Sequence, residues 1–148
     1  MHFNVKEDII QLTPLWKGER FEDGRPKVSD EDIAELKKLT QEQIWESLWE
    51  NDYKNQFESH LMRIHEDDRK LIGRAVTAAY IPSRPDLFDV VEEIGHSEGR
   101  KGTHNLWVVD KLVDGDVAVV DMYDKVYEGT FVGGNLSTAI STNTKTGG

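Results

Sequence analysis

An α/β domain that follows a mainly helical extension is the fold class that this sequence predicts. Residues 71–81 and 117–121 are rich in small and β-branched side chains, which are typical of buried strands. The residues before His65 instead repeat apolar side chains at helical spacing. We therefore expect a helical extension over residues 1–68 and the α/β domain over residues 69–148.

Composition limits the classes of function. The 148 residues contain no apolar run near the roughly twenty residues that span a bilayer, and residues 1–6 lack the apolar core of a signal peptide. We expect a soluble, cytoplasmic protein that does not act at a membrane. The formal net charge of −10 argues against nonspecific nucleic-acid binding. Because the chain has no cysteine, any metal would need oxygen or imidazole ligands.

Capping patterns define the helices of the extension. A short helix is expected over residues 6–12. Ser29 precedes an acidic first turn and caps a second helix that should end at Thr40. Thr40 caps a third helix, with Gln43 three residues later completing a capping box.

The aromatic and imidazole side chains of the extension have structural interpretations. Trp45 and Trp49 share one helix face, which is typical of a core or of a subunit interface. His60 and His65 are five residues apart, so they do not share a helix face as a helical metal motif requires. We interpret both histidines as structural.

In the α/β domain, a helix should follow the first strand. Pro82 stops that strand, and Pro85 starts a helix that ends at Gly95. The side chains expected to face inward from this helix are Leu87, Val90, Val91 and Ile94.

Residues 96–104 form a polar loop, whose bases could meet an acidic substrate or simply lie in solvent. Residues 106–112 are apolar and are compatible with helix or strand. Asp114-Gly115-Asp116 predicts a turn before the second strand. Asp121, at the end of that strand, is a candidate polar group near the site.

Two glycines near the C-terminus mark the candidate site. Residues 126–132 are expected to be extended, and a helix over residues 136–143 follows Gly133 and Gly134. Glycines let backbone N–H groups approach a ligand, and a helix N-terminus favours a carboxylate or phosphate. The alternative is a tight turn capped by the side chain of Asn135 or Ser137.

Three landmarks together resemble the RraA-like family. They are Gly-Arg-Ala-Val-Thr at 73–77, Asp-Gly-Asp-Val-Ala-Val-Val-Asp at 114–121 and Gly-Gly-Asn-Leu at 133–136, in that order. This family includes the regulator of ribonuclease E activity and metal-dependent 4-hydroxy-4-methyl-2-oxoglutarate aldolases, which also decarboxylate oxaloacetate. The resemblance implies a swivelling β/β/α-type domain over residues 69–148, incomplete at its C-terminus.

The resemblance also implies a site. Gly133, Gly134, Asn135 and Leu136 would bind the substrate carboxylate, and Asn135 stands where the aldolases have an acidic residue. Their Arg-Asp pair, which steadies the substrate and holds Mg²⁺ or Mn²⁺, would fall beyond Gly148. The catalytic residues are therefore unknown, and no metal ligand is assigned within this chain.

The expected function follows from these implications. The chain would be part of a divalent-metal-dependent carbon–carbon lyase, an aldolase or decarboxylase of pyruvate-type 2-oxo acids, and inactive alone. It would act with a missing C-terminal segment or a second chain, in a homo-oligomer such as a trimer or hexamer. The alternative is a non-catalytic RraA-like regulator that binds a protein partner such as a ribonuclease.

Overall fold

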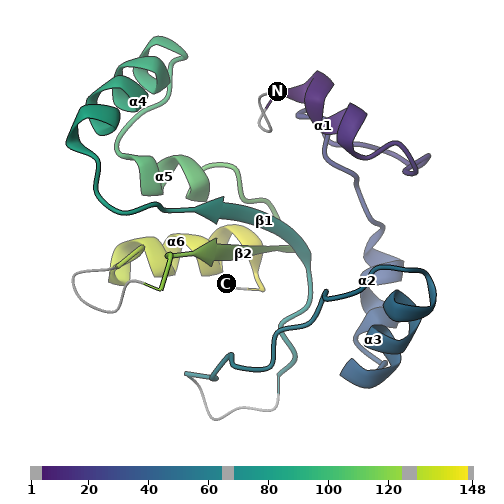
Figure 1. The fold of residues 1–148 in the computed structure, drawn as a ribbon. Coiled ribbons are helices and arrows are strands. Elements are labelled where there is room, and N and C mark those ends of the chain that lie inside the picture. The colour runs from purple at the N-terminus through teal and green to yellow at the C-terminus, as the bar shows by residue number, and fades with distance from the viewer. Residues whose placement is uncertain (1–4, 65–68, 125–129, 147–148) are drawn as a thin grey trace. The chain divides into compact units, whose positions relative to one another are not determined.

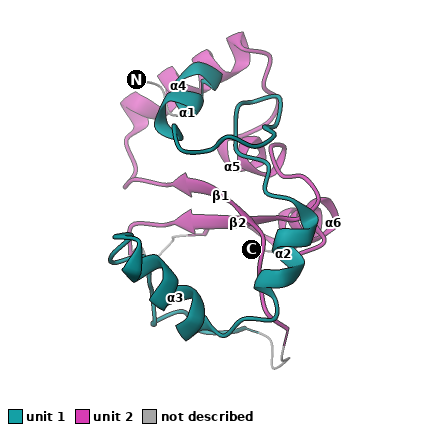
Figure 2. Ribbon diagram, turned by 90° about the vertical axis from the view of Figure 1, so that its right-hand side faces the viewer, with its two compact units in different colours: residues 1–68 teal, residues 69–148 magenta. Residues whose placement is uncertain are grey.

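The computed structural model describes residues 5–64, 69–124 and 130–146 (Figure 1). Within them it has six helices and a two-stranded parallel sheet. The predicted mixture of helix and strand is therefore confirmed. The chain divides into two compact units, residues 1–68 and 69–148 (Figure 2).

The first unit contains the helices α1 (Lys6–Leu12), α2 (Asp30–Leu36) and α3 (Gln41–Glu50). Ser29 Oγ accepts a hydrogen bond from the Asp32 N–H at 3.0 Å, and Thr40 and Gln43 form the predicted capping box. The predicted end of α2 at Thr40 is wrong. The helix ends at Leu36 because the following turns close through i→i+3 bonds, among them Leu39 N–H to Leu36 O at 3.2 Å.

Trp45 and Trp49 of α3 contact each other, with ring centroids 5.6 Å apart. Their side chains are 42% and 46% exposed, so they are not core residues, and a subunit interface stays a prediction. His60 lies in an irregular segment, where its Nδ1 is 2.7 Å from Glu58 Oε1. The prediction for His65 falls outside the described residues.

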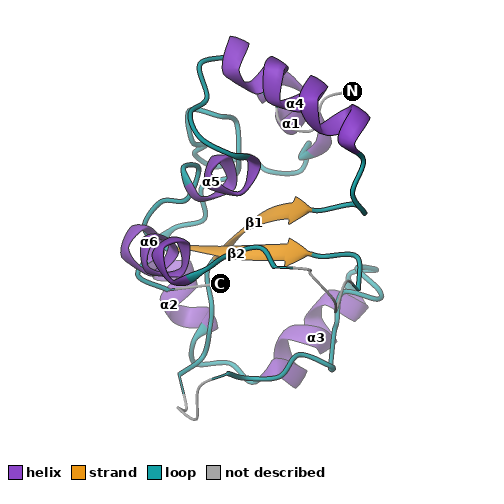
Figure 3. Ribbon diagram, turned by 90° about the vertical axis from the view of Figure 1, so that its left-hand side faces the viewer, coloured by secondary structure: helices purple, strands orange, loops and turns teal. Residues whose placement is uncertain are grey.

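The second unit is built on two parallel strands, β1 (Arg74–Ala79) and β2 (Asp116–Asp121), paired from Arg74 opposite Asp116 to Ala79 opposite Asp121. Both strands were predicted, although β1 is shorter than residues 71–81. Figure 3 shows the two arrows side by side and pointing the same way. Antiparallel pairing is excluded, which agrees with the long connection between the strands.

That connection holds two helices, α4 (Pro85–Ser97) and α5 (His104–Val109), and α6 (Gly134–Thr144) follows β2. The apolar stretch 106–112, left open by the sequence, therefore begins as a helix. Most of the predicted extended segment 126–132 lies outside the described residues, and residues 130–132 are not in a strand.

A small apolar core joins the sheet to α5 and α6. Buried side chains of both strands meet those of the two helices, and partly buried residues before and within α6 pack around them. The buried members are Val76, Val109, Leu112, Ala118 and Ile140.

One buried ion pair ties the starts of the two strands together. Arg74 Nε donates to Asp116 Oδ1 at 3.2 Å, and the Asp116 side chain has no exposed surface. Asp116 Oδ2 accepts from the Val113 N–H at 3.1 Å, and an Arg74 guanidinium N–H donates to the Asp114 carbonyl. The pair is thus embedded in the turn before β2.

The predicted inward face of α4 is wrong. Its four apolar side chains, Leu87, Val90, Val91 and Ile94, are between 39% and 52% exposed. The contacts of α4 run instead through buried Gly95 and through Phe88, whose ring lies 4.5 Å from that of His104. A side chain on Gly95 would clash with Trp107, because its Cβ would lie 2.6 Å from Trp107 Cζ3.

Removing the Asp116 carboxylate should strongly destabilise the chain. Asp116→Ala leaves the Arg74 guanidinium, 9% exposed, without this carboxylate and removes the acceptor of the Val113 N–H. We expect a loss of about 3–5 kcal/mol in the free energy of unfolding, measured by urea titration. Asp114→Ala is the control, because it removes an exposed carboxylate of the same turn, and should change stability little. Equal effects of both variants would contradict the role given to burial.

Adding a side chain at Gly95, where α4 contacts Trp107, should also destabilise the second unit. Gly95→Ala forces the Trp107 ring to move, and overpacking of this kind costs about 1–3 kcal/mol. Urea titration and the near-ultraviolet circular dichroism of tryptophan would both report the change. Gly134→Ala is the matched control, since its Cβ meets nothing within 4 Å. Unchanged stability in Gly95→Ala would show that α4 does not rest on Trp107.

Candidate functional site

The glycine turn, residues 133–136, begins helix α6 at the carboxyl edge of the sheet. Figure 1 shows the arrowheads of β1 and β2 at the same edge, with α6 starting there and running back along β2. Ligands of open parallel sheets bind outside the carboxyl ends of the strands. The sequence-predicted site residues therefore lie at the edge where such sites form.

No side chain caps this turn. Gly133 is the N-cap, with φ −105° and ψ −173°, and it makes no side-chain cap bond. The interpretation of Asn135 or Ser137 as cap is therefore wrong. Ser137 Oγ instead donates to the Gly133 carbonyl at 3.0 Å, because it lies a full turn into the helix.

The two glycines are not required by the packing of the described chain. A Cβ added to Gly133 or to Gly134 would meet nothing within 4 Å. Neither glycine has the positive φ that makes other residues strained. Among the described residues, a larger side chain would therefore be tolerated at either position.

The first backbone N–H groups of α6 have no acceptors within the helix. The first bond from the helix to its N-cap runs from the Ser137 N–H to the Gly133 carbonyl at 3.0 Å. The N–H groups of Gly134, Asn135 and Leu136 precede it, so none of them has an acceptor within the helix. Three adjacent donors at the positive end of a helix dipole suit a carboxylate.

Neighbouring elements position the segment that leads into the turn. Asn105 Nδ2 donates to the Phe131 carbonyl at 3.1 Å, and the rings of Tyr80 and Phe131 lie 5.4 Å apart. Tyr80 Oη also donates to the His104 carbonyl at 3.3 Å, and burial raises the pKa of Tyr80. The sequence analysis missed Asn105 and Tyr80, because nothing in their local pattern signals a contact with Phe131.

Asp121 lies at the same edge of the sheet, as predicted, but it shapes a different turn. Its Oδ1 accepts a hydrogen bond from the Tyr123 N–H at 2.7 Å. Tyr123 and Asp124 both adopt positive φ, 58° and 52°, which the short bond from Asp121 helps to hold. Asp121 is therefore assigned a role in the loop after β2.

Within the part of the chain that the structure describes, no group of three or more His, Asp or Glu side chains is arranged to hold a metal ion. Among the same residues, the helices are too short or too polar to cross a membrane.

Comparisons with known proteins identify no relative of this chain. No family model matches the sequence, and neither the search of curated proteins nor that of solved structures gave a match.

Proposed function

We propose that this chain supplies the carboxylate-binding turn of an RraA-like, divalent-metal-dependent carbon–carbon lyase that acts on pyruvate-type 2-oxo acids. One observation supports it above the others. Gly133 is the N-cap and Gly134 the first residue of an eleven-residue helix at the carboxyl edge of the sheet, yet neither the packing of the described residues nor backbone conformation requires a glycine at either position. Space for a ligand at the turn would explain why a glycine occupies each of the two positions.

The turn would bind and orient the substrate. The N–H groups of Gly134, Asn135 and Leu136 donate to the carboxylate, and each charge–dipole interaction of this kind is worth about 0.3–1 kcal/mol at an exposed site. Asn135 is exposed and neutral, so its side chain adds an amide without repelling the bound anion. Binding at the turn fixes which end of a 2-oxo acid points away from α6.

The rest of the proposed enzyme rests on the resemblance. It comprises the swivelling β/β/α-type domain, Mg²⁺ or Mn²⁺, an Arg-Asp pair that these 148 residues do not supply, and a homo-oligomer. The residues of this chain are proposed to bind the carboxylate only.

A second function, a regulator that binds a protein partner such as a ribonuclease, is favoured by one feature. Helix α4 exposes a row of apolar side chains, Leu87, Phe88, Val90, Val91 and Ile94. Exposed apolar patches of this kind commonly mark protein interfaces. Such a regulator would not need the open glycine turn, and so the enzyme remains our first proposal.

Replacing Gly134 by valine should abolish anion binding at the turn. The branched side chain enters the open space in front of the α6 amides and blocks the carboxylate. We expect pyruvate and oxalate to bind the unaltered chain and to bind Gly134→Val at least about tenfold more weakly, by calorimetric titration. Ser141→Val is the matched control, since it places the same side chain at an exposed position two turns further along α6. Equal affinity in all three proteins would leave the turn a purely structural feature.

The 148-residue chain should bind 2-oxo acids without turning them over. We expect no oxaloacetate decarboxylation above the rate of the free metal ion, because the Arg-Asp pair is not part of these residues. A longer chain that carries the pair should decarboxylate oxaloacetate, lose the activity with EDTA and regain it with Mg²⁺ or Mn²⁺. A metal-loaded longer chain that processes no 2-oxo acid but binds a ribonuclease would favour the regulator.

A further inference from the structure

Helix α4 carries two neighbouring stripes of exposed side chains along its length. In each stripe the residues recur at spacings of three and four, which places them on one face of a helix. The apolar stripe comprises Leu87, Val90, Val91 and Ile94, and the acidic stripe comprises Asp86, Asp89 and Glu93. An exposed apolar surface therefore borders a row of carboxylates on this side of the helix.

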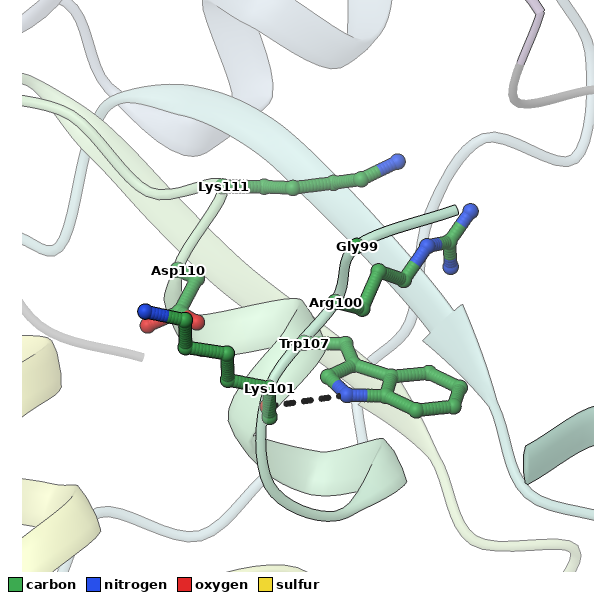
Figure 4. Close-up of a pocket in the computed structure, with 6 residues that line it drawn as sticks. All are labelled: Gly99, Arg100, Lys101, Trp107, Asp110 and Lys111. Atoms are coloured by element: carbon green, nitrogen blue, oxygen red, sulfur yellow. Dashed lines mark hydrogen bonds between the residues drawn. The ribbon is translucent and has the colours of Figure 1, made fainter. Parts of the chain in front are cut away.

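The other side of α4 holds these stripes in a defined orientation. Phe88 contacts the His104 ring, and buried Gly95 lies against Trp107. Trp107 is positioned in turn by the loop after α4, because its Nε1 donates to the Lys101 carbonyl at 3.0 Å (Figure 4). The helix therefore presents a preformed surface, which a partner does not need to order on binding.

The acidic stripe determines the charge of a complementary partner. Asp86 is paired with Arg84 at 2.6 Å. No ion pair within the described residues involves Asp89 or Glu93, and both side chains are exposed. Complementary charges across an interface select the correct partner and accelerate its association. The surface is thus complementary to apolar side chains that lie next to lysine or arginine.

Other occupants lack this chemistry. In an antiparallel two-fold pair of chains the acidic stripe of each α4 would face that of the other, since the same flank of both helices meets at such an axis. Each copy also carries a formal net charge of −10. Nucleic acids and anionic membrane surfaces are themselves negative, so this side of the helix would repel them.

We propose that the two stripes of α4 bind an amphipathic helix of another protein, whose apolar side is bordered by lysine or arginine. The thirteen residues of α4 extend over about 20 Å, which is enough for apolar contacts on three successive turns of such a helix. The apolar stripe supplies the buried contacts, and the acidic stripe selects a basic partner. This inference rests on the second function proposed above only in that both need a protein partner, and it is independent of the glycine turn.

The test uses a synthetic amphipathic peptide of about 18 residues, with leucine on one side and lysine on both flanks, so that it exceeds the length of α4. It is titrated into the ¹⁵N-labelled 148-residue chain and followed by calorimetry and by NMR of the backbone amides. We expect saturable binding of one peptide per chain, with the shifted signals concentrated in α4. A second peptide with glutamate in place of lysine should bind at least about tenfold more weakly.

Two double variants test the two stripes separately. Val90→Ser with Ile94→Ser should weaken binding of the lysine peptide about tenfold or more, because it removes apolar contacts. Asp89→Asn with Glu93→Gln should weaken it at least about threefold and make it less dependent on salt. All four side chains are exposed, so both variants are expected to fold.

Glu46→Gln with Glu50→Gln is the matched control, because it removes two exposed carboxylates from α3, the other acidic helix with exposed apolar side chains. This variant should bind the lysine peptide normally, and so should Gly134→Val, which separates this surface from the carboxylate-binding turn. Shifts concentrated in α3, an equal loss in the α3 variant, or equal affinity for the two peptides would each overturn the proposal. Ribonuclease binding by a longer chain that survives Val90→Ser with Ile94→Ser would overturn the assignment to α4 while keeping the regulator.

Discussion

The buried pair of Arg74 and Asp116 is the constraint on which the second unit depends. It occupies the first register position of the sheet, and a slip of one residue would separate the buried carboxylate from the guanidinium. The same carboxylate accepts the Val113 N–H, so it fixes the turn that introduces β2. This interaction therefore fixes the register at the start of the sheet and the turn that introduces the second strand.

The C-terminal end of α6 is hydrogen-bonded to the residues around Asp116. The Gly115 N–H donates to the carbonyl of buried Thr144 at 2.9 Å, and Thr146 Oγ1 donates to the Asp116 carbonyl. Since the C-terminus of α6 is held at the amino ends of the strands, its length of eleven residues, about 16 Å, returns its N-terminus toward their carboxyl edge. The position of the glycine turn is thus a consequence of the register at the far end of the sheet.

Local signals were sufficient for the parts of this structure that local interactions determine. The capping box of Thr40 and Gln43, the start of α4 at Pro85 and the positive φ of Gly115 each depend on residues that are close together in the sequence. The face of α4 was mispredicted because periodicity shows that a helix has an apolar side but not whether anything covers it. Asn105 was missed for a related reason: its bond to Phe131 spans 26 residues and carries no signature in the sequence.

The composition of α6 gives its first turn a distinct thermodynamic character. The sequence Gly-Asn-Leu-Ser-Thr-Ala-Ile-Ser-Thr-Asn-Thr is poor in strong helix formers, and Ser137 and Thr138 bond back to the carbonyls of the glycines. The stability of α6 therefore comes from the packing of Ile140 and its neighbours rather than from helix propensity. A carboxylate at the proposed turn would bind only the helical state, because the three N–H donors converge only there. Substitutions that change the helicity of α6 would therefore change the affinity for that carboxylate as well.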